Sequence, residues 1–547
     1  MSPPSSIPSL IDAFFQHVYP LPSYAFLHPP TILRKLADDS IDRSLVIAIA
    51  AVSSVRAPGI QRSPSLESAW VQEAETLIWQ HLESPSIARL QAMLLVILYR
   101  AETGQLRRAF MLASLAGRAA TALRLNYERP DSSATSLEVR RRLMWSLKLV
   151  ERYFSVGLPE FELCPVENIY IQLPCVEYQF SSDGGDWRTL DDQGSYHISV
   201  KLEMFRRDVM KLNRSLALCD QPFPSLPKMM NDFQQHLDRI GMLLPDGVEP
   251  TQEQLERWIT SQWLPRYLIM RLSFHQIHID LYRLVLRKFR DAAPRVVLDA
   301  LEVDFLDRAE AMCIHHAKMS VHTIATMNST LVEEPTRLLE FDTAICAYTA
   351  SRMLLFTARF GQTSERPTEE FALSRANMCL AVVQRFFPRS MLVRPIIDEL
   401  RRLIGVFSSH EQAPSRFSSP KLSGAAQERD LTTQLSSAAR IRQRLAIHSL
   451  LRQANFVDEE DEQTDSRSAQ RIQPNTTTST SQAAVADTPM TDDSPETQGE
   501  NQPWAQWLFE GQAPENDMQP VNLNQRSFVF PWLTREESNL ASHSLSR

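Results

Sequence analysis

The sequence predicts an all-α fold, a large multi-helix bundle followed by a disordered C-terminal tail. Glycine is scarce, with 14 in 547 residues, whereas folds rich in sheet need frequent glycines at their turns. Through roughly the first 400 residues, apolar side chains recur at helical rather than alternating spacing. Beyond Gly405 the composition shifts to Ser, Thr, Gln, Asp and Glu, which bury too little apolar area to offset chain entropy.

The amino-terminal helices are predicted from the spacing of their apolar residues and from their expected N-caps. Thr31 and Ser136 are expected N-caps, because their hydroxyls can accept hydrogen bonds from free backbone N–H groups at a helix start. Ala109, Ala113, Ala116 and Ala120 form one stripe, which lets a neighbouring helix approach closely. The helical ranges expected in this part are 9–18, the turn after Thr31, 41–55, 65–82, 86–99, 106–125 and 137–156.

The second half begins with an irregular, proline-bearing stretch from Gly157 to Pro174, followed by a polar loop. Helices are expected to resume near Tyr196 and to include 263–289, 303–327, 343–358 and 371–387. The predicted organisation is a disordered N-terminus (1–8), one helical domain (9–408) and a disordered tail (409–547) with a short helix at 430–453.

Charge and cysteine content exclude several classes of protein. The formal net charge of −8 argues against broad attraction to a nucleic-acid backbone. The six cysteines show no CxxC pair and follow no secretory leader, so we expect reduced intracellular thiols. The longest clean apolar run, 92–99, is far shorter than the ~20 residues of a membrane span, so no membrane contact is expected.

Three blocks of sequence carry a family resemblance when they are read together: 10–31, 87–125, and 138–157 with 167–174. They resemble the middle homology region of fungal binuclear zinc-cluster transcription factors, also called the fungal-specific transcription factor domain. The resemblance is dense to Pro174 and continues as a pattern to about Gly405. Its fingerprint residues are Phe26, His28, Pro29, Thr31, Gly104, Arg108, Ala109, Arg140, Arg141, Arg142, Trp145, Arg152, Gly157, Ile169 and Pro174.

The resemblance implies an all-helical regulatory domain that controls RNA polymerase II transcription in the nucleus. It would act through transcriptional coregulators, other transcription factors or a small-molecule effector. Members carry a zinc cluster of six closely spaced cysteines before this region, whereas Cys164 and Cys175, the first cysteines here, are eleven residues apart. No cofactor is therefore expected in this chain, and DNA binding would need a zinc cluster supplied by a missing exon or a partner.

Two groups of side chains are weighed as ligand-binding candidates. His275 and His278 share a helical face, as do Cys313 and His316, which is a weak zinc pattern; ordinary interhelical histidines and a buried thiol are the favoured interpretation. Arg140, Arg141 and Arg142 could contact phosphate or serve in nuclear import. Three successive residues span most of a helical turn, so structural pairing with carboxylates is favoured. Trp145 on the same helix is expected in the core.

No enzyme is predicted, because no phosphate-binding loop, nucleophile elbow or metalloprotease pattern occurs. The paired acids Asp191–Asp192 and Glu333–Glu334 are expected to be solvated. The alternative to a transcription regulator is a non-transcriptional helical adaptor or scaffold, suggested by the alanine stripe at 106–125.

The tail combines acids with bulky aromatic residues, a mixture typical of activation segments. An acidic run at 457–462 precedes aromatic motifs at 504–509 and 528–533. A spacer whose aromatics pack back on the helical body is the equally weighted alternative. The candidate activation residues are Trp504, Trp507, Leu508, Phe509, Phe528, Phe530 and Trp532.

Overall fold

The computed structural model describes residues 6–154, 162–180, 192, 194–289, 291–331 and 337–411. This part of the chain is built from helices joined by turns and contains no strand, so the prediction of an all-α fold is confirmed. The predicted features at 430–453, 504–509 and 528–533 lie outside the described residues.

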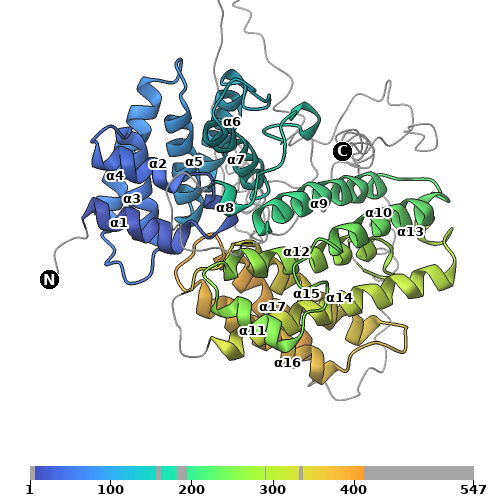
Figure 1. Cartoon of the computed structure of the whole chain (residues 1–547). Helices are drawn as coiled ribbons and strands as arrows, with labels where there is room; N and C mark the ends of the chain where they lie inside the picture. Colours follow the sequence, from blue (N-terminus) through green and yellow to red (C-terminus); the bar gives the residue numbers. More distant parts are fainter. Residues whose placement is uncertain are drawn as a thin grey trace, which may run out of the picture. The chain divides into compact units, whose positions relative to one another are not determined.

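The first group of helices ends at Glu151 and is drawn in blue to teal in Figure 1. Within it, α3 packs on α4 and α5, and α5 packs on α6. The central helix α3 is buried from Ser44 to Ser54. The elements are α1 (Ile7–Ala13), a π-helical turn (Phe14–Val18), a 3-10 turn (Pro22–Tyr24), α2 (Pro29–Ala37), α3 (Arg43–Arg56), α4 (Pro64–Gln80), α5 (Ile87–Glu102), α6 (Leu106–Ala122) and α7 (Ala134–Glu151).

The second group is drawn in green to orange in Figure 1. Here α12 packs between α9 and α14, while α15 contacts α14, α16 and α17. The elements are α9 (Ser195–Ala217), α10 (Leu226–Gly241), α11 (Gln252–Thr260), α12 (Leu264–Tyr282), α13 (Arg295–Leu298), α14 (Val303–Thr330), α15 (Asp342–Phe360), α16 (Glu369–Phe386) and α17 (Arg394–Glu411).

Residues 162–180 connect the two groups and are called the strap below. The strap contains a 3-10 turn at Val166–Asn168 and the short helix α8 (Glu177–Phe180). It lies against α6, where a Cβ added to Gly117 would come within 3.0 Å of the carbonyl oxygen of Leu163. From residue 162 to Pro174 the expected irregular stretch is present, while residues 157–161 lie outside the described part of the chain. The absence of a side chain at Gly117 allows it to pass close to α6.

The alanine stripe behaves as its spacing predicts. Ala109, Ala113, Ala116 and Ala120 are all buried, on a helix that packs closely against α5. Small side chains permit this approach because larger ones would hold the two helix backbones apart.

Both expected N-caps were wrong by about one turn. Helix α2 has His28 at its N-cap and Pro29 at its first position, so Thr31 lies inside the helix. Helix α7 is capped by Ser133, whose Oγ accepts from the backbone N–H of Ser136. Pro29 explains the first difference, because proline at the first helical position is pre-set for a helix and loses no hydrogen bond.

Other boundaries also differ from the predicted ones. Helix α1 begins at Ile7, before the expected start at residue 9, and α12 ends at Tyr282 rather than continuing to residue 289. Helices α10, α11 and α17 were not predicted as separate elements. Each presents one narrow apolar face, with buried residues such as Phe233 and Leu237 in α10, which a long polar background obscures in sequence.

Candidate functional site

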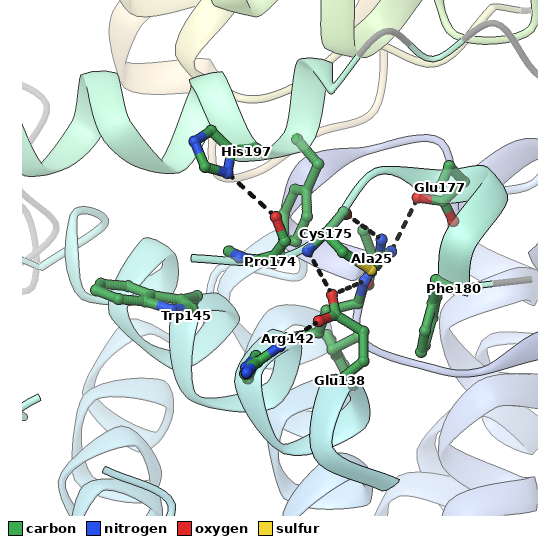
Figure 2. Close-up of polar contacts among 12 residues, drawn as sticks. Ala25, Glu138, Arg142, Trp145, Pro174, Cys175, Glu177, Phe180 and His197 are labelled. Carbon is green, nitrogen blue, oxygen red and sulfur yellow. Dashed lines mark hydrogen bonds and ion pairs between the residues drawn. The ribbon is translucent and has the colours of Figure 1, made fainter. Parts of the chain in front are cut away.

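Three of the fingerprint residues, Arg142, Trp145 and Pro174, lie where α7 faces the strap, shown in Figure 2. The buried face of helix α7 carries charged side chains, among them Glu138, Arg142, Lys148 and Glu151. Buried charges are tolerated when partners compensate their lost hydration. The partners here are mostly the backbone and carboxylates of the strap.

Arg142 is the centre of this arrangement and is completely buried. Its Nε donates to Glu138 Oε1 at 3.0 Å, and its Nη1 donates to Glu177 Oε2 at 2.9 Å. Its Nη2 donates to the carbonyl oxygen of Cys175 at 3.1 Å, and the ring of Phe180 covers the guanidinium at 4.0 Å. One side chain therefore ties α7 to three positions at the end of the strap, as Figure 2 shows.

Glu177 receives a second arginine from the other group of helices. Arg266 of α12 donates to Glu177 Oε2 at 2.9 Å, and the hydroxyl of Tyr19 donates to Glu177 Oε1. Burial alone would raise the pKa of Glu177, but Arg142 and Arg266 outweigh burial and hold the pKa at about 2. The carboxylate is therefore ionised and links α7, α12 and Tyr19, which directly follows the π-helical turn.

The neighbouring acid Asp192 contradicts its prediction. It was expected to be solvated, yet it is buried and lies 3.5 Å from Nη1 of Arg266. Burial raises its pKa to about 6, with Arg266 opposing that effect. The error arose because a polar local sequence does not reveal a cation 74 residues away. Asp191, Glu333 and Glu334 lie outside the described residues.

The other two arginines of the run are paired separately. Arg141 donates to Glu128 at 2.8 Å, and Arg140 donates to the carbonyl oxygens of Leu123 and Arg124 just beyond the end of α6. Arg141 also lies 3.7 Å from Glu138, the carboxylate that Arg142 contacts. The interpretation of the run as structural pairing therefore agrees with these contacts.

Further along α7, the same face holds the middle of the strap. Trp145 is buried and its Nε1 donates to the carbonyl oxygen of Gln172 at 2.8 Å. Glu151 accepts from the backbone N–H of Leu163, and Lys148 donates to the carbonyl oxygen of Cys164. These bonds satisfy strap backbone that has no ladder or helix of its own to satisfy it.

The aromatic, His, Pro and Thr turn holds the last residue of the strap. His28 lies between the carbonyl oxygen of Phe180, 2.9 Å from Nε2, and the hydroxyl of Thr31, 2.7 Å from Nδ1. Because a carbonyl can only accept, Nε2 carries the proton and Nδ1 accepts from Thr31. Phe26 is buried in the same turn, and Pro29 begins α2.

Arg152 forms a second junction between the two helical groups. Its Nη2 donates to Glu340 Oε1 at 2.8 Å, and its Nε lies 2.6 Å from Asp342 at the start of α15. Glu340 also accepts from Ser23 and Tyr153. Burial alone would lower the pKa of Arg152. The carboxylates of Asp342 and Glu340 outweigh burial, so the pKa of Arg152 lies above its usual value.

The remaining fingerprint positions have local structural roles. Gly104 adopts a φ of +83° after α5, and a Cβ there would lie 3.2 Å from Cβ of Met391. Arg108 pairs with Glu75, which also accepts from Arg100. Ile169 is fully buried, and the carbonyl oxygen of Pro174 bonds to His197. Gly157 lies outside the described residues.

Three of the four metal candidates meet, but not as a metal site. Nδ1 of His275 and Nδ1 of His316 are 2.9 Å apart, and the rings of His278 and His316 stack with centroids 3.9 Å apart. Stacked rings direct their nitrogen lone pairs in parallel rather than toward one point. In the part of the chain that is described, no group of His, Cys, Asp or Glu side chains could hold a metal ion.

The thiols near the strap are chemically quiet. Burial, then the carboxylate of Glu138, raises the pKa of Cys175 to about 12, and burial raises that of Cys164 to about 12. A protonated thiol is a poor nucleophile. The contacts of α7 described above hold the backbone of the strap in place.

Sequence reasoning missed Tyr19, Glu177 and Arg266 as members of this site. One signal for Arg266 was available, since apolar residues surround it in the expected helix 263–289. A cation in a fully buried helix requires a paired acid. No comparable local signal marks Glu177, which follows a proline-bearing loop.

Comparison with known proteins finds a family to which part of this chain is similar. Residues 11–259 match the model of the fungal specific transcription factor domain. The Zn(2)-C6 fungal-type transcription factor FTF1c of Fusarium oxysporum f. sp. lycopersici is 29% identical over 191 residues, 31% of this chain and 20% of that protein. A second alignment to a protein of that name is 27% identical over 348 residues, 52% of this chain and 37% of that protein.

An uncharacterized transcriptional regulatory protein of Schizosaccharomyces pombe is 28% identical over 313 residues, 50% of this chain and 32% of that protein. The chain thus spans between about a fifth and two fifths of the length of these curated relatives. No solved structure matches it. Every helix in the described residues is too short or too polar to cross a bilayer. The strap and the α7 arginines that hold it lie within residues 11–259, the range that matches the fungal specific transcription factor domain.

Proposed function

We propose that the chain regulates RNA polymerase II transcription in the nucleus, through protein partners that contact its helical domain (9–408) and its acidic tail (409–547). The domain match supports a role in transcription regulation. DNA recognition would come from a zinc cluster supplied by a further exon or by a partner.

One observation supports regulation through protein contacts rather than through phosphate contacts of the fingerprint. The side chain of Arg142 is 0% exposed and that of Arg141 is 15% exposed, each with a carboxylate partner. An arginine in this state cannot neutralise a DNA phosphate without first leaving its partner. Arg141 and Arg142 therefore serve the fold, and partners would contact other parts of the domain surface.

A reporter assay tests the proposal. The full chain is fused to a heterologous DNA-binding module, and reporter output is compared with that of the module alone. A change in output is expected, and substituting Trp504, Trp507 and Leu508 together by alanine should abolish the part that the tail supplies. Asn501→Ala with Gln506→Ala, in the same segment, is the matched control and should leave output unchanged.

The alternative, a non-transcriptional scaffold, predicts a different pattern. Output of the fusion would equal that of the module alone, although pull-downs with the chain still capture partners. A fluorescently tagged chain is expected to concentrate in the nucleus. Exclusion from the nucleus would contradict the proposed role.

A further inference from the structure

The turn that ends α6 holds an arginine in a backbone conformation that usually belongs to glycine. Arg124 has a φ of +52°, and the backbone N–H of Leu125 donates to the carbonyl oxygen of Ala120, so the helix ends in a left-handed cap. Glycine is favoured at such a position because it has no Cβ, whereas arginine is strained there. The side chain of Arg124 is exposed, and its guanidinium has no hydrogen-bond or ion-pair partner among the described residues.

Two further arginines meet at this turn. Nη2 of Arg140 donates to the carbonyl oxygens of Leu123 at 2.8 Å and of Arg124 at 3.0 Å. Nη2 of Arg129 donates to the same carbonyl oxygen of Leu123 at 3.5 Å. Two guanidinium groups therefore lie around one oxygen atom, and in the described part of the chain none of the three arginines has a carboxylate partner. The turn carries a local positive potential on an acidic protein.

Arg140 is the buried member of this group, and its charge is only partly compensated. The residue is 8% exposed, and its Nε has no hydrogen-bond partner among the described residues. Burial lowers the pKa of Arg140, and the charge of Arg129 lowers it further. Arg142 on the same helix is more deeply buried but has two carboxylate partners. Arg140 thus lacks an anion, and a negative charge added beside it would be stabilised.

Two exposed tyrosine rings belong to the same turn and to the strap beside it. The backbone N–H of Tyr127 donates to the carbonyl oxygen of Arg124, the atom that also accepts from Arg140. The rings of Tyr127 and Tyr170 stack with centroids 5.3 Å apart, although the two residues are 52% and 50% exposed. The backbone N–H of Tyr170 donates to the carbonyl oxygen of Asn126 at 2.8 Å, which fixes the strap here. The α6 end patch, as it is called below, consists of Arg124, Tyr127, Arg129, Arg140 and Tyr170.

We propose that the α6 end patch binds a short acidic segment of a partner protein that also carries bulky apolar side chains. Carboxylates of the segment pair with the exposed Arg124 and Arg129, and Arg140 adds positive charge to the same site. The apolar side chains cover the rings of Tyr127 and Tyr170, which the domain itself leaves half exposed. The choice of a protein as the partner rests on the proposed function.

Acidic residues around the patch argue against a nucleic acid as its partner. Asp131 is exposed two residues after Arg129, and Glu167 of the strap, three residues before Tyr170, is 44% exposed. A continuous phosphate backbone would run across these carboxylates, on a chain whose net charge is −8. A peptide can instead place one or two acids at the arginines and leave the surrounding carboxylates uncovered.

Binding is measured by fluorescence anisotropy with the full chain and a short labelled peptide. The peptide carries a pair of Glu residues next to Trp and Leu, and a matched peptide has Gln in place of Glu. Arg124→Gln with Arg129→Gln should weaken binding of the Glu peptide at least about ten-fold, and so should Tyr127→Ala.

Matched control variants change the same residue types elsewhere on the surface. They are Arg257→Gln with Arg295→Gln, exposed arginines of α11 and α13, and Tyr178→Ala, at a tyrosine that is 63% exposed. The control variants should bind the Glu peptide within about two-fold of the wild type.

Arg124→Gly separates binding from folding. Glycine relieves the strain at a positive φ, so the midpoint of thermal unfolding should not fall, while binding of the Glu peptide should weaken at least about three-fold. A lowered midpoint would show that the side chain of Arg124 contributes to the fold, and would contradict its assignment to a partner.

Several results would overturn this inference. Equal weakening in the control variants would mean unspecific attraction between the peptide and the surface. Equal binding of the Gln peptide would remove the role of the carboxylates. Displacement of the Glu peptide by single-stranded DNA at equal charge concentration would identify a phosphate partner instead. If the peptide binds while the reporter fusion stays silent, the proposed function alone is contradicted; if the reporter responds while the peptide does not bind, this inference alone is contradicted.

Discussion

At the scale of single residues, the helical domain contains buried arginines. Several partners together offset the desolvation free energy of each of these buried charges. Arg142, Arg152 and Arg266 are each at most 6% exposed. Pairs of this kind add little net stability when intact, but removing one partner leaves a buried charge without compensation. Glu177 would then face Arg266 and Tyr19 alone.

Arg142→Met should lower the free energy of unfolding by about 3–5 kcal/mol, because Glu138 and Glu177 lose a shared cation in a buried site. Urea unfolding followed by circular dichroism measures this change. Arg402→Met is the matched control, since Arg402 pairs with Glu399 on the exposed side of α17 and should cost less than about 1 kcal/mol. If both variants lost the same free energy of unfolding, the buried position of Arg142 would not make its ion pairs more important than an exposed pair.

Single residues also show what sequence can and cannot reveal about this site. The separate pairing of Arg140, Arg141 and Arg142 was predictable, because helix geometry alone prevents three consecutive side chains from sharing a face. The identity of their partners was not. Arg142 meets Glu177 across 35 residues and Arg266 meets it across 89, and no spacing rule links positions that only tertiary packing brings together.

At the scale of elements, Gly104 sets the turn between α5 and α6. Gly104→Ala should destabilise the domain by about 1–2 kcal/mol, because alanine is strained at a positive φ and Cβ of Met391 lies at 3.2 Å. Gly405→Ala is the matched comparison, since it lies inside α17 with no atom within 4 Å of an added Cβ. That variant should gain up to about 1 kcal/mol through helix propensity.

Thermal unfolding of the two glycine variants gives the measurement. A lowered midpoint for Gly104→Ala with a raised midpoint for Gly405→Ala is expected. Tolerance of alanine at position 104 would mean that the turn relaxes into another conformation, and that the glycine there has no conformational role.

The contact of α12 with α14 should weaken in acid. Burial lowers the pKa of His278 to about 4, and burial together with the neighbouring imidazoles places those of His275 and His316 well below 6.5. The unfolded chain therefore takes up protons first as pH falls. Stability present above pH 6.5 is lost progressively toward pH 4, by about 3 kcal/mol for His278.

His278→Asn removes this proton uptake, while its amide can still donate to the carbonyl oxygen of Phe274 as Nδ1 of His278 does. The slope of unfolding free energy between pH 6.5 and 4 should be smaller in this variant. His315→Asn is the control, because that side chain is 45% exposed, and its slope should match the wild type. An unchanged slope for His278→Asn would contradict the role of this imidazole.

Elements were predicted well where one face is continuously apolar and poorly where polar residues dominate. Helices α3 to α7 follow their spacing closely. The cap of α7 did not, because Ser133 and Ser136 are both suitable hydroxyl caps and the direction of the incoming chain decides between them. Helices α10, α11 and α17 owe their structure to packing of a few residues, and isolated polar segments of this length carry little signal of their own.

At the scale of the whole helical domain, the strap joins the two groups of helices. On one side, Glu151, Trp145 and Arg142 of α7 form hydrogen bonds with the strap. On the other side, Arg207 of α9 donates a hydrogen bond to Glu162 at 2.7 Å. The strap has little regular structure, so its order depends on these side chains. That dependence gives the family fingerprint a physical reason, which the sequence resemblance by itself did not supply.

Amide hydrogen exchange across residues 162–180 tests this central claim most directly. In the wild-type chain the strap amides should be protected as strongly as those of α7, and Arg142→Met should raise their exchange far more than that of α3. Strap amides that exchange as fast as a free peptide in the wild type, or that are indifferent to Arg142→Met, would contradict the account.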